Sequence, residues 1–404
     1  EGVTDSVAVV EDASGQRTLR VNNRFTMGGT ASAPAERRHA HLPLLLHPAP
    51  KRALFLGAGT GITFGAAGAY PGLEADAVEL VPEVAAMVRH FAPENSSAEW
   101  SPRLRLFVAD ARRFVRVATN RYDVIVADLF HPARDGAGAL YTREHYQAIR
   151  QRLQPGGLFC QWLPLYQLDE PMLRVIVQTF LDVFPHSRGY LLRLNLETPV
   201  LGLVGTLVAT RYPPDWFEKR VPDGGLREQL KSLALPDSMQ LFGCLVASPE
   251  GLRRFATGAL LNRDDRPVVM FAAPRFAYRH EASAHGRLFA WLARRDADPK
   301  ELLEDRPDAG PFARRLAQYI AARDMYLRGL LADKEGRSAA AVDAWVESAR
   351  LSEDFSTGYA YCLTLAVQQA KDHPQAARAL LDRLIAAQPA RPVAGELKKR
   401  LFGP

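Results

Sequence analysis

Residues 52–61 read Arg-Ala-Leu-Phe-Leu-Gly-Ala-Gly-Thr-Gly, and this stretch decides the fold that we expect. The apolar run 53–56 is typical of a strand buried in a parallel sheet. Gly57, Gly59 and Gly61 follow it, and glycines here let the backbone adopt positive φ and let a ligand approach the main chain closely. The stretch therefore predicts a strand, a tight loop and a ligand site.

Three acidic residues follow successive predicted strands. Glu79 ends an apolar stretch about 20 residues after the loop begins, where a carboxylate can accept hydrogen bonds from ribose hydroxyls. Asp110 ends the predicted strand 104–109, and Asp128 ends 122–127. Because the carboxyl ends of parallel strands meet at one edge of a sheet, we expect a nucleoside-binding crevice there. A tight turn without a ligand is the alternative.

Strands and helices alternate from residue 52 to residue 208. This alternation predicts an α/β fold with a doubly wound, Rossmann-like sheet of the methyltransferase type and an antiparallel tail. Further helices are expected at 82–91, 142–153 and 170–184, and further strands at 158–163, 189–194 and 200–208.

The N-terminal residues predict a small β region. Residues 7–11 and 17–21 are β-formers around a Ser-Gly turn, which predicts a hairpin. Residues 22–35 are rich in Gly, Ala and Ser and predict a loop, either a lid over the site or a connection. His39 and His41 are spaced like metal ligands on a strand, but no Cys or acidic partner is near in sequence, so we expect a helix or strand face and no metal.

We expect four parts in all. These are an N-terminal β region (1–48), the nucleoside-binding α/β domain (49–210), an accessory extension (211–305) and a helical domain (306–404). The extension predicts helices at 225–233 and 249–257. Its charged turn at 262–267 is more typical of an exposed, salt-bridged loop than of a catalytic site.

After residue 308 the predicted strands end. Five helices are expected, at 311–333, 338–352, 357–371, 374–387 and 393–402. Small and large apolar positions recur there with a period of about 34–36 residues, which resembles tetratricopeptide repeats. A plain helical bundle is the alternative. Such repeat arrays present concave surfaces. We therefore expect the helical domain to bind a protein partner or to cover the catalytic domain.

Composition narrows the class of protein. The chain has 404 residues, a formal charge of +6 and three widely spaced cysteines. The cysteines suggest a reducing compartment without structural disulfides. The arginines are scattered without interleaved aromatic residues, so we expect no nucleic-acid partner. The uncharged run 53–73 is better explained by strand, loop and helix than by a membrane span. A start at Glu1 suggests a fragment of a longer protein.

Residues 1–208 resemble the spermidine synthases, which are polyamine aminopropyltransferases. The likeness is closer to the soluble domain of bacterial proteins that fuse such a domain to a membrane-embedded, transporter-like half. The motifs that carry it are Leu-Pro-Leu-Leu-Leu-His-Pro (42–48), the glycine loop (57–61), Val-Glu-Leu (78–80), Val-Ala-Asp (108–110), Tyr-Asp-Val-Ile-Val-Ala-Asp-Leu-Phe-His-Pro (122–132), Leu-Tyr (140–141), Tyr146, Pro-Gly-Gly-Leu (155–158) and Gln161. The resemblance implies a cytoplasmic-side transferase, attached to a membrane in the full-length protein; homodimers are common in the family.

The resemblance also implies roles for single residues. Gly57, Gly59 and Gly61 hold the methionine portion of the sulfonium nucleoside, and Glu79 holds its ribose. Asp110, with the backbone of Ala111, reads the adenine amino edge.

Asp128 orients and helps to deprotonate the attacking amine. A sulfonium compound already carries a good leaving group, so alignment and one base suffice.

Several positions depart from the family pattern. The loop aspartate that pairs with the donor's amine is Thr60, and the second aspartate after Asp128 is His131. Tyrosines that enclose the polyamine are replaced near Ala35 and at Thr198. A dication needs such partners to offset its desolvation, so the nucleoside half of the site is kept and the polyamine half is not. Without the loop aspartate, S-adenosylmethionine becomes more plausible than its decarboxylated form.

Several functions remain open. The first is a spermidine synthase-like enzyme that acts on a non-standard acceptor, or on the sulfonium compound itself, with Asp128 as base. His131 either assists it, binds an acidic acceptor or is a structural turn residue. The others are a genuine polyamine synthase, a methyltransferase and a non-catalytic nucleoside sensor.

Overall fold

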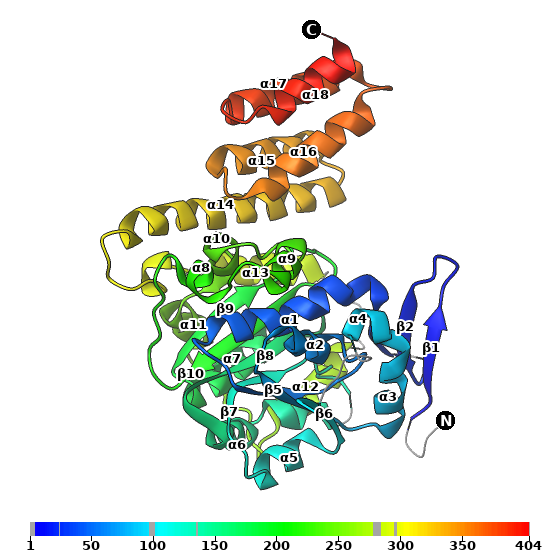
Figure 1. Cartoon of the computed structure of the whole chain (residues 1–404), viewed down its shortest axis with the longest axis vertical. Helices are drawn as coiled ribbons and strands as arrows, with labels where there is room; N and C mark the ends of the chain where they lie inside the picture. Colours follow the sequence, from blue (N-terminus) through cyan, green and yellow to red (C-terminus); the bar gives the residue numbers. More distant parts are fainter. Residues whose placement is uncertain are drawn as a thin grey trace.

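The computed structural model describes residues 5–23, 25–96, 102–134, 136–277, 284–294 and 297–403. These residues form an N-terminal three-stranded sheet, an α/β part around an eight-stranded sheet, and a stack of C-terminal helices (Figure 1). None of the helices in these ranges combines the length and the apolar character that a bilayer span requires. The three cysteines, all of which lie in these ranges, are buried and unpaired.

The N-terminal sheet is antiparallel and has one strand more than predicted. The expected hairpin is confirmed as β1 (Val7–Glu11) and β2 (Arg17–Val21). The expected loop at 22–35 is wrong in part, because β3 (Phe25–Gly29) pairs with β2. Phe25 and Met27 of this strand pack on a small apolar cluster. That burial holds the segment extended, whereas the following glycines suggested a loop.

Helix α1 (Ala33–Leu46) follows and contains both histidines of the 37–41 stretch. The predicted β region at 1–48 is therefore wrong in its second half. Nine of the helix residues are buried, and they contact β7, β8 and α2. Because residues 39–46 are all buried, the second half of this helix is enclosed by the sheet and its neighbouring elements.

The central sheet confirms the predicted parallel sheet with an antiparallel tail. Its strand order is β11-β9-β10-β8-β7-β4-β5-β6. The strands from β8 to β6 are parallel, and β10, β9 and β11 continue the sheet in antiparallel fashion. The bounds are β4 (Arg52–Leu56), β5 (Glu74–Glu79), β6 (Leu104–Val108), β7 (Tyr122–Ala127), β8 (Leu153–Pro164), β9 (His186–Leu191), β10 (Val200–Thr206) and β11 (Leu245–Ala247).

Helices cover both faces of this sheet. Successive side chains of a strand point to opposite faces, and β4 shows it: Ala53 and Phe55 belong to one buried cluster, Leu54 and Leu56 to another. The helices between the strands are α2 (Ile62–Gly65), α3 (Pro82–Met87), α4 (Ala92–Asn95), α5 (Ala111–Val117), α6 (Arg143–Arg152) and α7 (Glu170–Val183), with 3₁₀ turns η2 (Ala66–Ala69), η3 (Val88–Phe91), η5 (Ala137–Tyr141) and η6 (Leu165–Gln167). The predicted helix at 82–91 is thus split into α3 and η3.

Residues 211–305 close one side of the α/β part. The predicted helices at 225–233 and 249–257 are confirmed as α9 (Gly225–Ser232) and α11 (Pro249–Ala256). The other elements are α8 (Trp216–Arg220), α10 (Ser238–Phe242), α12 (Val268–Ala277), α13 (Ala284–Arg294) and η7 (Pro299–Glu301). Strand β11 extends the sheet, while α11 and α12 contact α7.

The charged turn at 262–267 is salt-bridged, as predicted. Asp264 pairs with Arg112 and with Arg116, and Arg263 lies 3.7 Å from Glu144. These pairs fasten the turn to α5 and α6, so the turn has a structural explanation.

The five predicted C-terminal helices are confirmed and stack away from the sheet (Figure 1). They are α14 (Ala309–Lys334), α15 (Ser338–Leu351), α16 (Ser356–Gln369), α17 (Pro374–Ala387) and α18 (Val393–Phe402). The buried cluster that lies on one sheet face continues into this stack. At Gly329 a Cβ atom would meet the Trp345 ring at 2.3 Å, so α14 and α15 pack closely there. The assignment as tetratricopeptide repeats stays a prediction.

Candidate active site

Backbone hydrogen bonds place the predicted site residues at one edge of the sheet. The N–H of Gly57 donates to Val78 O at 2.8 Å, and that of Asp128 donates to Leu56 O at 3.0 Å. On the other side, the N–H of Ala109 donates to Glu79 O at 2.9 Å. The glycine loop therefore lies between the ends of β5 and β7, and Asp110 follows the end of β6. These contacts bring the three predicted carboxylates to neighbouring positions along this edge.

The glycine loop has the backbone conformation that its sequence suggested. Gly57, Gly59 and Gly61 have φ values of 87°, 53° and 77°. A Cβ atom on Gly57 would lie 3.2 Å from the Phe130 ring, and one on Gly59 would lie 3.3 Å from Met27 O. The loop is thus confined between the segment after β7 and the N-terminal sheet, and a side chain there would narrow the approach to its main chain.

Glu79 is buried and holds this loop. Its Oε2 accepts hydrogen bonds from the N–H groups of Ala58 at 3.1 Å and Gly59 at 3.2 Å. Its Oε1 accepts one from Val81 N–H at 3.0 Å. A carboxylate oxygen can accept two hydrogen bonds, so these contacts leave acceptor capacity for ribose hydroxyls.

Thr60 is paired with an acidic residue that sequence reasoning did not select. Its hydroxyl donates to Oε2 of Glu36 at 2.6 Å, and Ser32 Oγ donates to Oε1 of the same carboxyl group. Gly29 N–H donates to Oε1 at 3.2 Å. The loop therefore has a carboxyl group beside it although its own aspartate is replaced. This corrects the argument that Thr60 leaves a donor carboxylate unopposed.

Burial raises the pKa of Glu36, and the charge of Asp128 raises it further, although the hydrogen bonds from Ser32 and Thr60 lower it. The two carboxyl groups are therefore electrostatically coupled across the site. Proton uptake by Glu36 is easier than at an exposed glutamate.

Asp128 contacts a buried histidine from α1. Nδ1 of His39 lies 3.5 Å from Oδ1 of Asp128. The His39 ring stacks on Trp162, with 4.6 Å between ring centroids and an angle of 26°. The indole N–H of Trp162 donates to the carbonyl of His39 at 3.1 Å. Trp162 thus holds both the ring and the backbone of His39, which places the imidazole beside the Asp128 carboxylate.

The pKa of Asp128 is lowered below its ordinary value of 3.8. Burial acts to raise it, but the His39 ring, the N–H of Leu129, which donates to Oδ1 at 2.9 Å, and the Thr63 side chain lower it. Asp128 is therefore a carboxylate at neutral pH, as a general base must be.

His131 lies in the same loop after β7. Its Nδ1 is paired with the Gln167 side-chain amide, and its ring lies 5.8 Å from the Phe25 ring. Burial lowers the pKa of His131 and Arg134 lowers it further, although the Gln167 contact raises it. The imidazole is therefore neutral at neutral pH and can take part in hydrogen bonds without carrying a charge.

The outer part of the edge carries Asp110 and exposed apolar side chains. Asp110 is exposed and caps α5, since its Oδ1 accepts from Arg113 N–H at 2.8 Å. Ala111 is the first residue of that helix. Leu80 and Val108, next to the ends of β5 and β6, are 61% and 54% exposed. Exposed apolar side chains beside a free carboxylate oxygen suit a flat, partly polar base.

Within the described ranges, no group of three or more His, Cys, Asp or Glu side chains is placed to hold a metal ion. His41, the second histidine of the 37–41 stretch, instead lies 2.9 Å from the hydroxyl of Tyr70 through its Nδ1. Burial lowers the pKa of His41 to about 3.

Sequence reasoning missed Glu36 and His39 as site residues. Both are on α1, far along the chain from the loops they contact. A glutamate near a helix start is common, and a histidine in an apolar stretch is usually a core residue. Only the packing of α1 across the sheet distinguishes them.

Comparisons with known proteins show what this chain is similar to. The family described as "Spermine/spermidine synthase domain" matches residues 35–199. A polyamine aminopropyltransferase of Thermotoga maritima is 32% identical over 245 residues, 59% of this chain and 70% of that protein. One from Nitrosomonas europaea is 32% identical over 189 residues, 46% of this chain and 57% of its own. Putrescine N-methyltransferase 2 of Nicotiana attenuata is 28% identical over 214 residues, 52% of this chain and 56% of that enzyme.

The chain thus spans little more than half the length of two of these relatives. Among solved structures, the spermidine synthase of Thermotoga maritima aligns with a TM-score of 0.46 and 20% identity, over 71% of this chain and 86% of that one.

Proposed function

The chain belongs to the spermine/spermidine synthase family, and from that premise we propose that it is a transferase whose donor is S-adenosylmethionine or its decarboxylated form. The observation that carries the proposal is the backbone pairing at one sheet edge, which aligns the glycine loop, Glu79, Asp110 and Asp128. In this proposal Gly57, Gly59 and Gly61 let the donor approach the main chain.

The donor is held in three places. Glu79 accepts a ribose hydroxyl at the one acceptor position, on Oε1, that its hydrogen bonds to Ala58, Gly59 and Val81 leave free. Asp110 and the N–H of Ala111 form hydrogen bonds with the amino edge of the adenine ring. The ring itself lies between the side chains of Leu80 and Val108. Glu36, with Thr60, attracts the donor's ammonium group.

Asp128 acts as the base in the reaction. The acceptor's nucleophilic atom attacks a carbon bonded to the sulfonium sulfur, and the C–S bond breaks with its electron pair going to sulfur. The proton lost by the acceptor goes to Asp128, which His39 keeps ionised and oriented. His131 hydrogen-bonds the acceptor from the same loop.

The choice of donor depends on Glu36. When ionised, this carboxylate attracts an ammonium group and repels a donor carboxylate, so it favours the decarboxylated form. When protonated, it accepts both forms. Since burial raises the pKa of Glu36, the preference for the decarboxylated donor increases as pH rises.

We propose a non-standard acceptor, or the sulfonium compound itself as the only substrate. The positions that the family resemblance assigns to polyamine contacts hold Ala35, His131 and Thr198, and Thr198 lies beside Arg193 at 3.4 Å. A neutral imidazole and a guanidinium do not offset the free-energy cost of removing the two positive charges of a diamine from water.

Two other functions are distinguished by their products. Genuine polyamine synthesis converts putrescine and decarboxylated donor to spermidine and methylthioadenosine. Methyl transfer, which the putrescine N-methyltransferase relative suggests, yields S-adenosylhomocysteine. Incubation with both donors and a panel of amines, followed by mass spectrometry of the thio-nucleoside product, separates the three. Binding of donor without any product, in the wild type and in Asp128→Asn alike, points to a sensor; no binding of either donor rejects the proposal.

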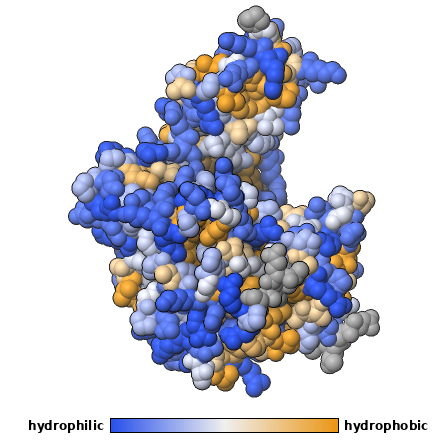
Figure 2. All heavy atoms as spheres, viewed as in Figure 1, coloured by the Kyte–Doolittle hydropathy of each residue, from blue (hydrophilic) through white to orange (hydrophobic). Residues whose placement is uncertain are grey.

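The remaining parts of the proposal concern partners. We propose that the helical stack is a tetratricopeptide-like array that binds a protein, and that the full-length protein carries a membrane-embedded, transporter-like half on whose cytoplasmic side this domain lies. Figure 2 shows apolar side chains on the outer end of the stack. Two apolar residues of the stack, Val367 and Val393, are exposed. A homodimer is a further proposal, which sedimentation at several concentrations tests.

A further inference from the structure

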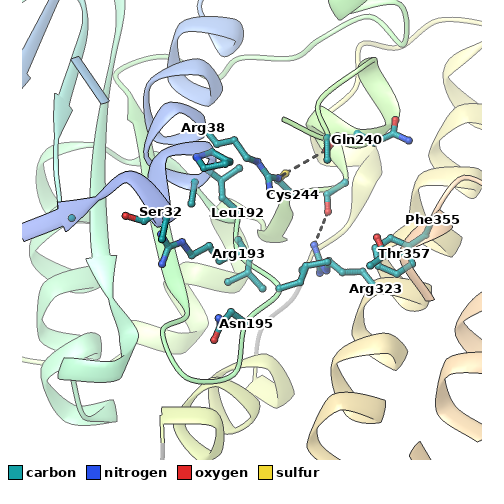
Figure 3. Close-up of a pocket in the computed structure, with 18 of the residues that line it drawn as sticks. Ser32, Arg38, Leu192, Arg193, Asn195, Gln240, Cys244, Arg323, Phe355 and Thr357 are labelled. Atoms are coloured by element: carbon teal, nitrogen blue, oxygen red, sulfur yellow. Dashed lines mark hydrogen bonds between the residues drawn. The ribbon is translucent and has the colours of Figure 1, made fainter. Parts of the chain in front are cut away.

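A cavity of about 650 Å³ lies where the α/β part meets the helical stack (Figure 3). Its walls come from the end of β3, the first turns of α1, the segment after β9, α10 and the helices α14 and α16. It is separate from the backbone edge that carries Glu79, Asp110 and Asp128, none of which lines it.

Three arginines from three different segments line this cavity. Arg38 comes from α1, Arg193 from the segment after β9, and Arg323 from α14 (Figure 3). No Asp or Glu is among the described residues that line it. The remaining walls are largely backbone, hydroxyl and apolar or aromatic groups, such as Leu192 and Phe355.

Two of these guanidinium groups have no carboxylate partner among the residues that the structure describes. Arg38 has a buried Nε without a hydrogen-bond partner, and its Nη2 contacts only the sulfur of Cys244, at 3.9 Å. Arg193 has one weak contact, 3.4 Å from Nη1 to the Thr198 hydroxyl. In the described ranges, neither forms an ion pair with a carboxylate.

Arg323 has its charge partly compensated. It is 1% exposed, donates to the carbonyls of Gly243 and Leu245, and pairs with Asp324 at 2.9 Å. Burial raises the pKa of the Cys244 thiol, although Arg38 and Arg323 lower it. The thiol is therefore neutral at neutral pH and supplies no counter-charge.

From this arrangement we propose that the cavity binds a small anionic molecule through a carboxylate or phosphate group, with Arg38 and Arg193 as its ligands and Arg323 as a fixed positive wall. Partly desolvated guanidinium groups gain most from an anion, because their charge is otherwise uncompensated. The planar fork of arginine matches the geometry of both carboxylate and phosphate oxygens. This inference is independent of the proposed transferase reaction.

The cavity is connected to the glycine loop through the hydrogen bonds of Glu36. Ser32 and Gly29 line the cavity, and both donate hydrogen bonds to Glu36, which in turn accepts from Thr60. An anion in the cavity thus lies one side chain away from the proposed donor site.

The test uses the full chain and two probes, inorganic phosphate and citrate, at constant ionic strength. Calorimetric titration should show saturable binding of at least one of them. Phosphate alone indicates a phosphate-bearing ligand, and citrate alone indicates a carboxylate. Arg193→Gln and Arg38→Gln should each weaken binding at least about tenfold, because each removes a charged hydrogen-bond donor.

Arg328→Gln is the matched control, because Arg328 is an exposed residue of α14 outside the cavity. It should leave the affinity unchanged. Arg193→Lys keeps the positive charge but lacks the planar guanidinium group with its paired N–H donors. It should bind the probes with an intermediate affinity. Circular dichroism melting confirms that each variant is folded. Absence of binding by both probes, or equal binding by folded Arg193→Gln and Arg328→Gln, overturns the proposal.

Discussion

The hydroxyl of Thr60 donates a 2.6 Å hydrogen bond to the carboxyl group of Glu36, and this pair joins the glycine loop to the start of α1. The loop position that the family resemblance assigns to an aspartate thus keeps an acidic neighbour, supplied from another element. The charge beside the loop therefore depends on the protonation of Glu36, which burial makes easier.

Glu36→Gln should make stability less dependent on pH. The pKa of Glu36 is raised above its ordinary value of 4.5, so the folded state binds more protons than the unfolded state above that pH. The wild type should therefore lose stability as pH rises from about 4.5 through the folded-state pKa, while this contribution is absent in the variant. Thermal melting between pH 4.5 and pH 8 measures the difference. A variant that is increasingly less stable than the wild type as pH rises contradicts this.

The same variant should change donor selectivity. With a neutral amide at position 36, the ratio of affinities for decarboxylated and ordinary S-adenosylmethionine should lose its dependence on pH and move toward ordinary S-adenosylmethionine by roughly threefold to tenfold. Calorimetric titration with each donor at pH 6 and pH 8 tests this. An unchanged ratio would mean that Glu36 does not contact the donor's amino-acid end.

Asp128→Asn should reduce turnover by about 10²–10⁴-fold while donor binding changes little, because the amide cannot accept the acceptor's proton. The pKa of Asp128 is lowered below 3.8, so the wild-type rate should show no loss from protonation of this group until the pH falls to that range. Single-turnover rates as a function of pH provide the measurement. Strong loss of donor affinity in the variant would instead assign Asp128 to binding.

His39→Phe should separate positioning from packing. Phenylalanine can keep the stacking on Trp162, but it removes the nitrogen that lies 3.5 Å from Asp128. We expect a lower kcat with little change in KM for the donor, together with a higher pKa of Asp128, because burial is then less opposed. His39→Ala is the contrasting variant and should cost roughly 2–4 kcal/mol of stability through the cavity it creates. If His39→Phe has wild-type kcat, His39 is a core residue only.

Gly59→Ala should impair donor binding. Gly59 has a φ of 53°, and a Cβ atom there would lie 3.3 Å from the carbonyl oxygen of Met27. Gly72→Ala is the matched control, since its φ is 79° but no atom lies within 4 Å of the added Cβ. Both variants should lose about 1–2 kcal/mol from backbone strain. Only Gly59→Ala should also weaken donor binding, by roughly tenfold or more; equal affinities in the two variants would exclude close approach of the donor to this glycine.

Local patterns in the sequence determined most of the architecture. Apolar runs that end in Gly57, Glu79, Asp110 and Asp128 predicted both the strands and the edge at which these residues meet. That edge follows from chain direction alone, because parallel strands all end on the same side of a sheet. The helices of the C-terminal stack were predicted for the same reason, since their periodicity is local.

Only the tertiary structure decided what surrounds these residues. The contacts of Glu36 with Thr60, and of His39 with Asp128, join segments whose separation along the chain carries no local signal. Likewise, the three arginines of the cavity come from α1, the segment after β9 and α14, and each alone looks like an ordinary surface residue in sequence. Whether one charge compensates another depends on their distance in space. The preference of the site for cations, and that of the cavity for anions, therefore cannot be predicted until the chain is folded.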